Sequence, residues 1–478
     1  MATIRLQNAV SAHPDYQFSA PINIFVADGN NVAIVGRNGS GKSMLADIMT
    51  SKILCQKDSI VELSVGGQEL GREEVKCMSF RDIYKMADNK PTYYQQRWNA
   101  TENEDSPIVA DIIGPEKCQK HIDLAKRLEI DGILSKRLIF LSSGELRKMQ
   151  IFRSLLSHPK VLVIDNPYIG LDAGSRDVVN ELLRNLSVNE HIQIILILSN
   201  PADVPSFVSK IIPVSNMTVL PLMEASDFAI DTDLHQQMFD NKFVDHFPTV
   251  QKKSERPYEN AVIMNKVNVR YFTKQILKDV DWEVKRGEKW ALLGQNGCGK
   301  STLLSLVCGD NPQAYSNDIT LFDCKRGTGE SIWEIKSHIG YLSPDVHTYY
   351  QHDMPCIDVV ATGFFDTIGL HRKPNDEQRQ IARDWMKVFG AEHLTERSFV
   401  KISYGEQRLV LLCRVFVKSP SLLILDEPLH GLDVGKKRLA KAFIEHYCAS
   451  PDVTLIYVTH YRHEIPSVVT KEKVLLRN

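Results

Sequence analysis

The chain has 478 residues, of which 43% are hydrophobic and 24% are charged, with 57 lysines and arginines against 59 aspartates and glutamates. This ordinary globular composition excludes a disordered, collagen-like or disulfide-scaffold chain, and roughly 150 residues per domain gives about three domains, or two large ones. The net charge of −2 disfavours a general binder of nucleic acid or anionic membranes.

The cysteines and the apolar stretches indicate the compartment. Nine cysteines are scattered from Cys55 to Cys448 without a CxxC pair, which favours a reducing environment over disulfides or a zinc ribbon. The start, MATIRLQNAV, lacks the pattern of a signal peptide. Apolar stretches such as Ile194–Leu198 and Leu422–Leu425 are far shorter than the ~18 residues that span a bilayer. We therefore expect a cytoplasmic protein, at most peripheral on the cytoplasmic face of the inner membrane through a partner.

The first half begins with a strand, a glycine-rich turn and a helix. The apolar run Val32–Val35 predicts a buried strand, GRNGSGKS follows at Gly36–Ser43, and Lys42–Met49 has helix-forming residues. Further apolar runs at 161–164 and 193–198 predict strands that are buried on both faces of a parallel sheet. Strands that alternate with helices are typical of an α/β fold.

The second half repeats these features in the same order. GQNGCGKS at Gly294–Ser301 follows the apolar run Trp290–Leu293 and precedes the helix-forming segment Lys300–Val307. Strands are again predicted at 422–425 and 453–458. Three motifs recur at nearly one offset, which indicates a tandem duplication. They are the glycine-rich turns at Gly36 and Gly294, SSGE and SYGE at Ser142 and Ser403, and the strand-end carboxylates Asp165 and Asp426.

The duplication also sets the domain boundaries. We predict a first domain over residues 1–225, a helix and linker over 226–260, and a second domain over 261–478. The helix is predicted from apolar spacing near Ala225–Phe243. The linker is predicted from the polar stretch FPTVQKKSERPYEN, which contains two prolines.

The two GxxxxGK[ST] turns indicate nucleotide sites. Their glycines let backbone N–H groups converge on phosphates, and the following helix directs its positive end at the same groups. Lys42 and Lys300 would reach the β- and γ-phosphates, and Ser43 and Ser301 would ligate Mg²⁺. The alternative is a pair of ordinary glycine turns. The nucleotide-binding residues predicted here are Gly36, Asn38, Gly39, Gly41, Gly294, Asn296, Gly297, Gly299 and Thr302, with the lysines and serines.

The carboxylates at two strand ends complete the predicted chemistry. Asp165 and Asp426 would hold Mg²⁺ through its water shell. The next residue is Glu427 in the second half, a carboxylate that can act as general base towards the attacking water. In the first half it is Asn166, whose amide cannot accept that proton, so we expect a poor catalyst there. The alternative is that Asn166 is a tolerated isostere without effect.

The following strand ends in Thr459-His460 in the second half and in Ser199-Asn200 in the first. We expect His460 to hydrogen-bond the γ-phosphate and relay protons, and Asn200 to stand in its place in the first half. The SSGE and SYGE segments precede helices predicted from Leu146 and Arg408, and such helix starts can also bind phosphate. An ordinary N-cap with Glu145 or Glu406 nearby is the alternative.

Both halves of the chain resemble the ATP-binding cassette (ABC) family. The resemblance rests on the combination of motifs in one order, which is far more specific than a glycine-rich turn alone. The matching segments are the Walker A turns Gly36–Ser43 and Gly294–Ser301, the signatures Leu141–Glu145 and Ile402–Glu406, Asp165 and Asp426 of Walker B, the D-loops Gly170–Asp172 and Gly431–Asp433, and the switch histidine His460.

The resemblance implies two P-loop NTPase cassettes, each with a parallel-sheet core, an antiparallel β-subdomain and a small helical subdomain. It also implies a head-to-tail pair, in which each ATP with its Mg²⁺ lies between one P-loop and the signature of the other cassette. Ser403 and Gly405 would complete the first site, and Ser142 and Gly144 the second. We expect one hydrolytic site, the second, and one that mainly holds ATP.

Three segments depart from the family pattern or leave alternatives. The first Q-loop glutamine, a Mg²⁺ ligand, is assigned to Gln96, with Gln95 as a competitor, whereas Pro344 stands at this position in the second half. Because that loop senses the membrane partner in the family, Pro344 puts coupling at the second site in doubt. Cys298, inside the second P-loop, either fills a small-residue position or presents a reactive thiol.

The aromatic residue that stacks on adenine is assigned to Tyr271 in the second half. The equivalent step back from the first P-loop reaches His13, with Tyr16 and Phe18 as rivals. An aromatic side chain there can equally pack beneath the loop.

Within the family, the stretch Gly309–Tyr341 and the fused layout are similar to tandem ATP-binding proteins associated with molybdate transport. This implies a motor subunit for a membrane permease, with molybdate as the implied ligand. A protein that acts on nucleic acid or ribosomes is the alternative, which the short linker and negative charge disfavour. A regulatory ATP sensor is a third hypothesis.

Overall fold

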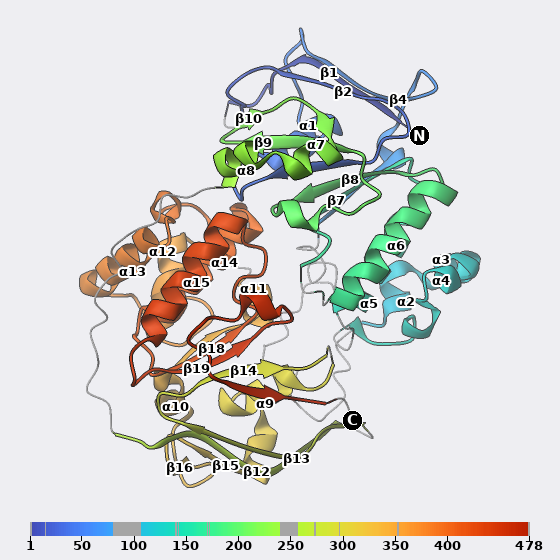
Figure 1. The fold of residues 1–478 in the computed structure, drawn as a ribbon. Helices are drawn as coiled ribbons and strands as arrows, with labels where there is room; N and C mark the ends of the chain where they lie inside the picture. The colour runs from blue at the N-terminus through green and yellow to red at the C-terminus, as the bar shows by residue number, and fades with distance from the viewer. Residues whose placement is uncertain are drawn as a thin grey trace. The chain divides into compact units, whose positions relative to one another are not determined.

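The computed structural model describes most of the chain, namely residues 2–14, 16–79, 107–138, 141, 143–169, 171, 173–239, 257–271, 274–295, 297–350 and 353–476. The chain forms two compact units (Figure 1). Residues up to Asn241 make most of the first unit, and residues from Lys242 make most of the second. Each unit contains a parallel sheet, an antiparallel sheet and a group of helices.

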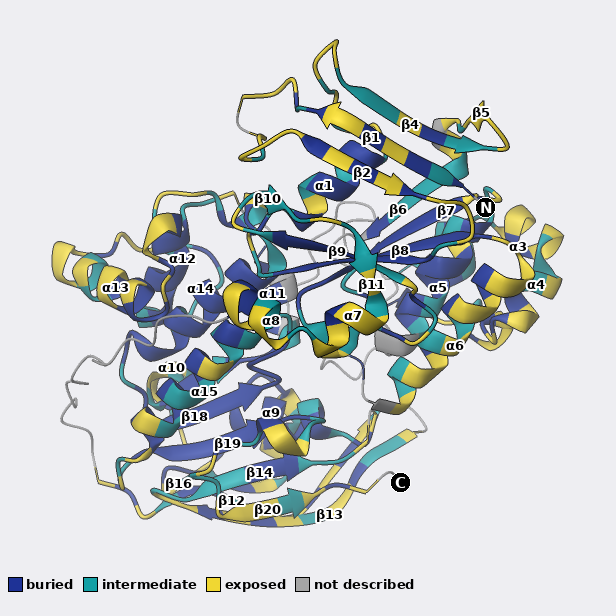
Figure 2. Ribbon diagram, turned by 45° about the horizontal axis from the view of Figure 1, so that its top comes forward, coloured by how far each residue is buried: buried dark blue, intermediate teal, exposed yellow. Residues whose placement is uncertain are grey.

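The first parallel sheet forms the centre of its unit, with the strand order β9-β3-β8-β7-β6. Its central strands β3, β7 and β8 are almost continuously buried, as Figure 2 shows, because helices or the second sheet cover both faces. Two short strands, β10 and β11, add antiparallel to β9. The bounds are β3 Val32–Gly36, β6 Val75–Ser79, β7 Val161–Asp165, β8 Gln193–Leu198, β9 Lys210–Ser215, β10 Thr218–Val219 and β11 Met223–Glu224.

The first antiparallel sheet has the order β2-β1-β4-β5 and is covered on one face only. Along β1, Ile4 and Leu6 are buried whereas Arg5 between them is exposed, the two-residue period of a one-sided sheet. The helix that follows the first P-loop, α1 (Lys42–Met49), lies between the two sheets, and Leu45 and Ile48 share their core with Ile4. The strands are β1 Thr3–Ala9, β2 Ile22–Val26, β4 Ile60–Val65 and β5 Gln68–Glu69.

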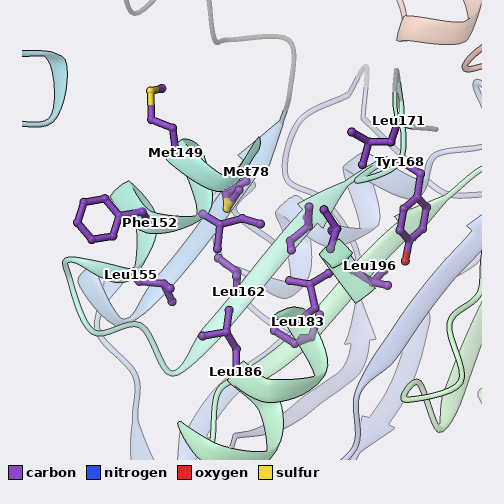
Figure 3. Packing of buried hydrophobic residues seen from close by; sticks show 14 of the residues in the cluster. Met78, Met149, Phe152, Leu155, Leu162, Tyr168, Leu171, Leu183, Leu186 and Leu196 are labelled. Atoms are coloured by element: carbon purple, nitrogen blue, oxygen red, sulfur yellow. The ribbon is translucent and has the colours of Figure 1, made fainter. Parts of the chain in front are cut away.

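Helices cover the other face of the first parallel sheet. Figure 3 shows Leu155 of α5 and Leu183 of α6 beside the central-strand residues Leu162 and Leu196, and Phe152 of α5 belongs to the same core. The same core includes Phe228, Met238 and Phe239, so the two helices before the second unit pack on the first one. The helices are α2 Val109–Ile113, α3 Pro115–Lys120, α4 Ile122–Arg127, α5 Ser143–Leu155, α6 Ala173–Asn189, α7 Ala225–Ile230 and α8 Thr232–Phe239.

The second parallel sheet repeats the strand order of the first. Its order, β20-β14-β19-β18-β17, matches β9-β3-β8-β7-β6, and all of its pairs are parallel. The register is also the same, because Trp290 pairs with Ile456 as Val32 pairs with Ile195. Equivalent residues can therefore be assigned from the hydrogen-bond ladders. The strands are β14 Lys289–Leu293, β17 Ile339–Leu342, β18 Leu422–Asp426, β19 Thr454–Val458 and β20 Lys471–Val474.

The second antiparallel sheet has the order β13-β12-β15-β16, and α9 (Lys300–Val307) packs into its core as α1 does in the first unit. Tyr258, which the sequence analysis placed in the linker, is buried in this core. Helices α13, α14 and α15 meet in an aromatic cluster in which the Phe416 ring centroid lies 4.8 Å from that of Phe443 and 5.3 Å from that of Trp385. The strands are β12 Asn260–Tyr271, β13 Lys274–Lys285, β15 Asp318–Leu321 and β16 Cys324–Lys325; the helices are α10 Ile332–His338, α11 Pro344–Tyr349, α12 Cys356–Ala361, α13 Asp376–Val388, α14 Tyr404–Phe416 and α15 Val434–Cys448.

Candidate functional site

Both P-loops connect the carboxyl end of a central strand to a helix, and both need glycine. Gly41 and Gly299 are the N-cap residues of α1 and α9, with left-handed φ angles of 101° and 100°. A Cβ atom on Gly36 would lie 2.1 Å from a carbonyl oxygen of β9, and one on Gly294 would lie 2.6 Å from a carbonyl just after β20. Because these obstacles are backbone atoms, side chains are excluded at the first position of each loop.

The P-loop lysines fold over their own loops. Lys42 Nζ donates to the carbonyl oxygens of the first two loop residues, at 2.9 and 2.6 Å, and Lys300 Nζ does the same in the second unit, at 2.6 and 3.1 Å. Both ammonium groups are buried. A positive charge held over a left-handed glycine turn and a helix N-terminus fits the phosphates of a nucleotide.

The serine after each lysine and the strand-end aspartate provide oxygen ligands for a cation. In the first unit, Ser43 Oγ donates to Asp165 Oδ2 at 3.0 Å. In the second unit, Ser301 lies in the first turn of α9 and Asp426 is the buried last residue of β18. Among the described residues, no group of three or more His, Cys, Asp and Glu could hold a metal ion. One hydroxyl and one carboxylate per site suit Mg²⁺, which keeps water and phosphate oxygens as its other ligands.

The residue after each aspartate adopts the same unusual backbone conformation in both units. Asn166 and Glu427 have left-handed φ angles of 49° and 50°. The Asn166 N–H donates to the Ile197 carbonyl and the Glu427 N–H donates to the Val458 carbonyl, each at 2.9 Å. Because Ile197 and Val458 are equivalent in the two strand ladders, Asn166 and Glu427 occupy the same position in the fold.

The side chains at this position interact differently. Asn166 Nδ2 donates to Asp165 Oδ1 at 2.7 Å, so the Asp165 carboxylate accepts from Ser43 on one oxygen and from Asn166 on the other. Glu427 Oε1 instead accepts from the backbone N–H of His460 at 2.9 Å. The first unit therefore has an amide that binds its neighbouring carboxylate, whereas the second has a second carboxylate.

The environment of Glu427 shifts its pKa towards neutrality. Burial raises the pKa of Glu427 from its ordinary 4.5 to about 8, and the negative charges of Asp426 and Glu464 act in the same direction. The hydrogen bond from His460 and the positive charge of Lys300 oppose this rise. The His460 Nε2 atom lies 3.7 Å from Glu427 Oε1. A carboxyl group with such a pKa can both take up and release a proton near pH 7.

The register of the strands corrects one prediction. Because β8 and β19 align Ile197 with Val458, the residue equivalent to His460 is Ser199, and Asn200 lies one position further on. Ser199 Oγ donates to Asn38 Oδ1 of the P-loop at 2.8 Å. The Asn200 side chain instead accepts from the Ala202 N–H at 3.1 Å and caps a short 3₁₀ helix. Sequence comparison aligned the last polar residues of the two segments and missed this one-residue difference.

The signature segments form the first turns of their helices, earlier than predicted. Ser403 is the N-cap of α14: its Oγ accepts from the Glu406 N–H at 3.4 Å, and its N–H donates to Glu406 Oε2 at 2.7 Å. This capping box starts the helix at Tyr404 rather than at Arg408. Gly405 is buried in this first turn. In the first unit α5 begins at Ser143, so Gly144 lies in its first turn, and Glu145 pairs with Lys136 at 2.7 Å.

Arg408 is a site residue that the sequence analysis missed. Its side chain is fully buried, and Nη1 donates to the Ser343 carbonyl at 3.1 Å. Nη2 donates to the carbonyls of Asp426 at 2.8 Å and Glu427 at 2.6 Å. Arg408 therefore connects the signature helix to the backbone that carries the general-base candidate. The available signal was the repeat itself, because Arg147 follows the first signature at the same position.

The predicted adenine-stacking aromatics lie in different environments. Tyr271 ends β12 and is half-buried, and its hydroxyl accepts from Asn311 Nδ2 at 3.0 Å. The rings of His13 and Tyr16 are 4.8 Å apart. Phe18 lies beneath the P-loop, with its ring 3.0 Å from the position of a Cβ atom on Gly41. Phe18 therefore has a packing role against the loop backbone.

The remaining P-loop positions follow the same arrangement. Gly39 and Gly297 are in left-handed conformations, with φ of 79° and 77°, and Thr302 is buried in the first turn of α9. Cys298 is buried, and its Sγ would be 2.6 Å from a Cβ atom on Gly294, so the thiol fills the inside of the loop. Some predicted residues lie outside the described part of the chain, namely Gln95, Gln96, Ser142, Gly170, Asp172 and Asn296.

The comparisons with known proteins agree with this arrangement. The ABC transporter family profile matches residues 20–169 and 277–430. The ABC transporter ATP-binding protein ModF of Escherichia coli (strain K12) is 34% identical over 456 residues, which cover 92% of this chain and 90% of ModF. The chain belongs to the ABC transporter family, as two tandem ATPase cassettes of an enzyme family that binds ATP, typically with Mg²⁺.

Solved structures with this fold have lower sequence identity. The RNase-L inhibitor structure has a TM-score of 0.54 and 18% identity, covering 98% of this chain and 87% of that one. A model of ribosome-bound archaeal Pelota and ABCE1 has a TM-score of 0.59 and 17% identity, and the match covers 95% of this chain and 74% of that one. These likenesses concern the fold. In the part of the chain that the structure describes, no helix has the length and apolarity needed to span a membrane.

Proposed function

We propose that the protein is a tandem ABC ATPase with two unequal sites, one hydrolytic and one that holds ATP. The observation that carries this proposal is the pair Asn166 and Glu427, which share backbone geometry and strand register but not proton chemistry. Since the two positions match in backbone geometry and strand register, we infer that the side chain decides which site hydrolyses ATP.

At the second site, Lys300 would bind the phosphates, Ser301 would ligate Mg²⁺ and Asp426 would hold it through its water shell. The ion would neutralise charge on the phosphates when bound. Glu427 accepts the proton of the attacking water on its carboxylate. Its pKa near 8 makes it a stronger base than an ordinary glutamate. His460 donates its backbone N–H to Glu427 Oε1, and in this proposal its side chain hydrogen-bonds the γ-phosphate.

The first site can bind ATP with Mg²⁺ by the same contacts, through Lys42, Ser43 and Asp165. The residue after Asp165, however, is not a general base. Asn166 donates its amide hydrogen to Asp165 and cannot accept a proton from water. Ser199, in the place of His460, is engaged with Asn38. We infer that this site keeps ATP bound through many turnovers of the other site.

The two sites are completed in a head-to-tail pair of cassettes, as the family resemblance implies. A helix N-terminus with a serine cap offers N–H groups to the phosphates of the opposite nucleotide. The first composite site combines Lys42, Ser43, Asp165 and Gln96 with Ser403 and Gly405, and the second combines Lys300, Ser301, Asp426, Glu427 and His460 with Ser142 and Gly144.

We further propose a membrane permease as the partner, by similarity to ModF, a protein named as a transporter component. The second unit has a cavity of about 510 Å³ whose lining includes Trp333 of α10, Val346 of α11 and Ile368. The Trp333 side chain is 58% exposed, which is unusual for tryptophan and favours a partner surface. A short helical segment of the permease is the occupant that we propose. Molybdate is the proposed transported ligand, from the resemblance of Gly309–Tyr341 to the molybdate-associated branch.

A protein that acts on ribosomes or nucleic acid is the second candidate. It is favoured by the fold likeness to the ribosome-bound archaeal model, which covers 95% of this chain. The net charge of −2 weighs against it, because binders of nucleic acid use positive surfaces.

The central experiment compares Glu427→Gln with Asn166→Gln in an ATPase assay. We expect Glu427→Gln to reduce turnover by about 10²- to 10⁴-fold, as for loss of a general base, and Asn166→Gln to leave it nearly unchanged. A similar loss from both substitutions would refute the unequal sites.

The partner is tested by purifying the protein from detergent-solubilised membranes and identifying the proteins that accompany it. A permease that is captured by the wild type but lost with Trp333→Glu supports the transport proposal. Tyr315→Glu is the matched control, because Tyr315 is also an exposed aromatic of the second unit and does not line the cavity. Capture of ribosomes or DNA supports the second candidate.

A further inference from the structure

A short helix replaces the loop that the sequence analysis expected around Pro344. Ser343 is the N-cap of α11, and its Oγ accepts from the Val346 N–H at 3.2 Å. Pro344 follows at the first helical position, where its missing N–H is not needed. The Ser-Pro sequence therefore encodes a helix start. Pro344 is therefore the first residue of a helix, α11.

His347 of α11 contacts the signature helix α14 in two ways. Its ring stacks on Tyr404, with centroids 4.4 Å apart and an interplanar angle of 25°. Its Nε2 atom is 3.0 Å from Gln407 Oε1. The Gln407 amide group donates from Nε2 to the Phe399 carbonyl at 2.7 Å, so its oxygen faces the imidazole. An amide oxygen only accepts, and therefore Nε2 of His347 carries the proton in this contact.

These contacts fall on the first turn of α14, where the signature segment lies. Tyr404 directly follows the N-cap Ser403, and Gln407 directly follows Glu406, whose carboxylate accepts from the Ser403 N–H. His347 and Gln407 are both buried, so their hydrogen bond is shielded from water. The contacts of His347 therefore fix the rotation of the turn that presents Ser403 and Gly405.

The first unit lacks the residue types that make these contacts in the second unit. At the positions equivalent to Tyr404 and Gln407, the first signature helix has Ser143 and Leu146. Serine has no ring on which an imidazole can stack, and leucine has no acceptor. The first signature cannot be held in this way.

We propose that His347 is a positioning residue for the second signature segment, Ser403–Glu406. It acts through Tyr404 and Gln407, and does not itself touch nucleotide. The inference rests on the proposed head-to-tail pair, in which this signature completes the site of the first P-loop. The loss of His347 should then weaken ATP binding at the first site and leave ATP binding at the second site largely unchanged.

The test measures binding of a fluorescent methylanthraniloyl-ATP with Mg²⁺ to full-length variants. Lys300→Ala disables the second P-loop, so the measured binding is that of the first site. Lys42→Ala disables the first P-loop, so the measured binding is that of the second site. We expect His347→Ala to weaken ATP binding about tenfold in the Lys300→Ala background, because a displaced Ser403 turn would lose about one hydrogen bond to a charged phosphate. In the Lys42→Ala background we expect no change. His446→Ala, an exposed histidine on α15, is the control.

Two further variants separate positioning from folding. His347→Phe keeps the ring stack and removes the donor, and should give an intermediate loss. Gln407→Leu introduces the first unit's residue, and combining it with His347→Phe should add little further loss. Equal weakening in both lysine backgrounds, weakening only in Lys42→Ala, or none at all would overturn the inference. If Glu427→Gln retained turnover, the proposed function would fail by a separate measurement.

Discussion

Asn166 donates its amide hydrogen to the Asp165 carboxylate at 2.7 Å, whereas Glu427, at the equivalent position, accepts a backbone hydrogen bond from His460 at 2.9 Å. The two residues have φ angles of 49° and 50°, so their backbones point the side chains alike. At this position the two units therefore differ in side-chain proton chemistry rather than in backbone conformation.

Introducing a carboxylate into the first site should create activity there. In a Lys300→Ala background, Asn166→Glu should raise ATP turnover about tenfold, which is less than the ~10²- to 10⁴-fold effect of a general base in a complete site, because Ser199 still replaces the switch histidine. The measurement is steady-state phosphate release. Asn166→Gln is the control and should give no rise. Absence of any gain with Asn166→Glu would place the defect of the first site elsewhere, with Ser199 as the next residue to change.

ATP hydrolysis should depend on pH through Glu427. The base acts as a carboxylate, and its pKa is raised to about 8. The ionised fraction therefore grows as the pH rises towards that value, so kcat/KM should increase up to about pH 8 and then level off. A pH–rate profile in constant ionic strength checks this. An activity that is already constant from pH 6 upwards would show that Glu427 is ionised with an ordinary pKa in the free enzyme.

The P-loop lysines should have unequal effects on turnover. Lys300→Ala should abolish most hydrolysis, because it removes the phosphate contact at the site that contains Glu427. Lys42→Ala should weaken nucleotide binding at one site while leaving part of the turnover. Both lysines make the same two carbonyl contacts in the structure, so a folding defect should be similar for both. Equal residual turnover would contradict unequal sites.

Arg408 should matter for both stability and catalysis. Arg408→Met removes three hydrogen bonds to buried carbonyls, and should destabilise the second unit by about 3 kcal/mol and lower kcat. Urea unfolding and ATPase assays measure the two effects. Arg408→Lys keeps the charge but reaches fewer carbonyls, so kcat should fall between the wild type and Arg408→Met. If kcat were unchanged in a folded Arg408→Met variant, the link from the signature helix to Glu427 would have no catalytic role.

Much of the fold could be predicted from local sequence. The helices Lys42–Met49 and Lys300–Val307 and the strand Gln193–Leu198 have the predicted bounds. Their signals are local, because a glycine turn needs positive φ, and a strand buried on both faces must be apolar throughout. The duplication then indicated two copies of one unit, and the family resemblance implied that each is a cassette.

What the sequence alone did not determine was set by contacts between distant segments. The hydrogen-bond ladder of β7, β8, β18 and β19 decided that Ser199, and not Asn200, is equivalent to His460. Packing decided that Phe18 lies beneath the first P-loop. Burial gave Glu427 a pKa of about 8 and placed Arg408 against three carbonyls, because desolvation and hydrogen-bond partners arise only when the chain is folded. The sequence by itself determined which residues can bind phosphate or accept a proton; the tertiary structure decided which of them meet.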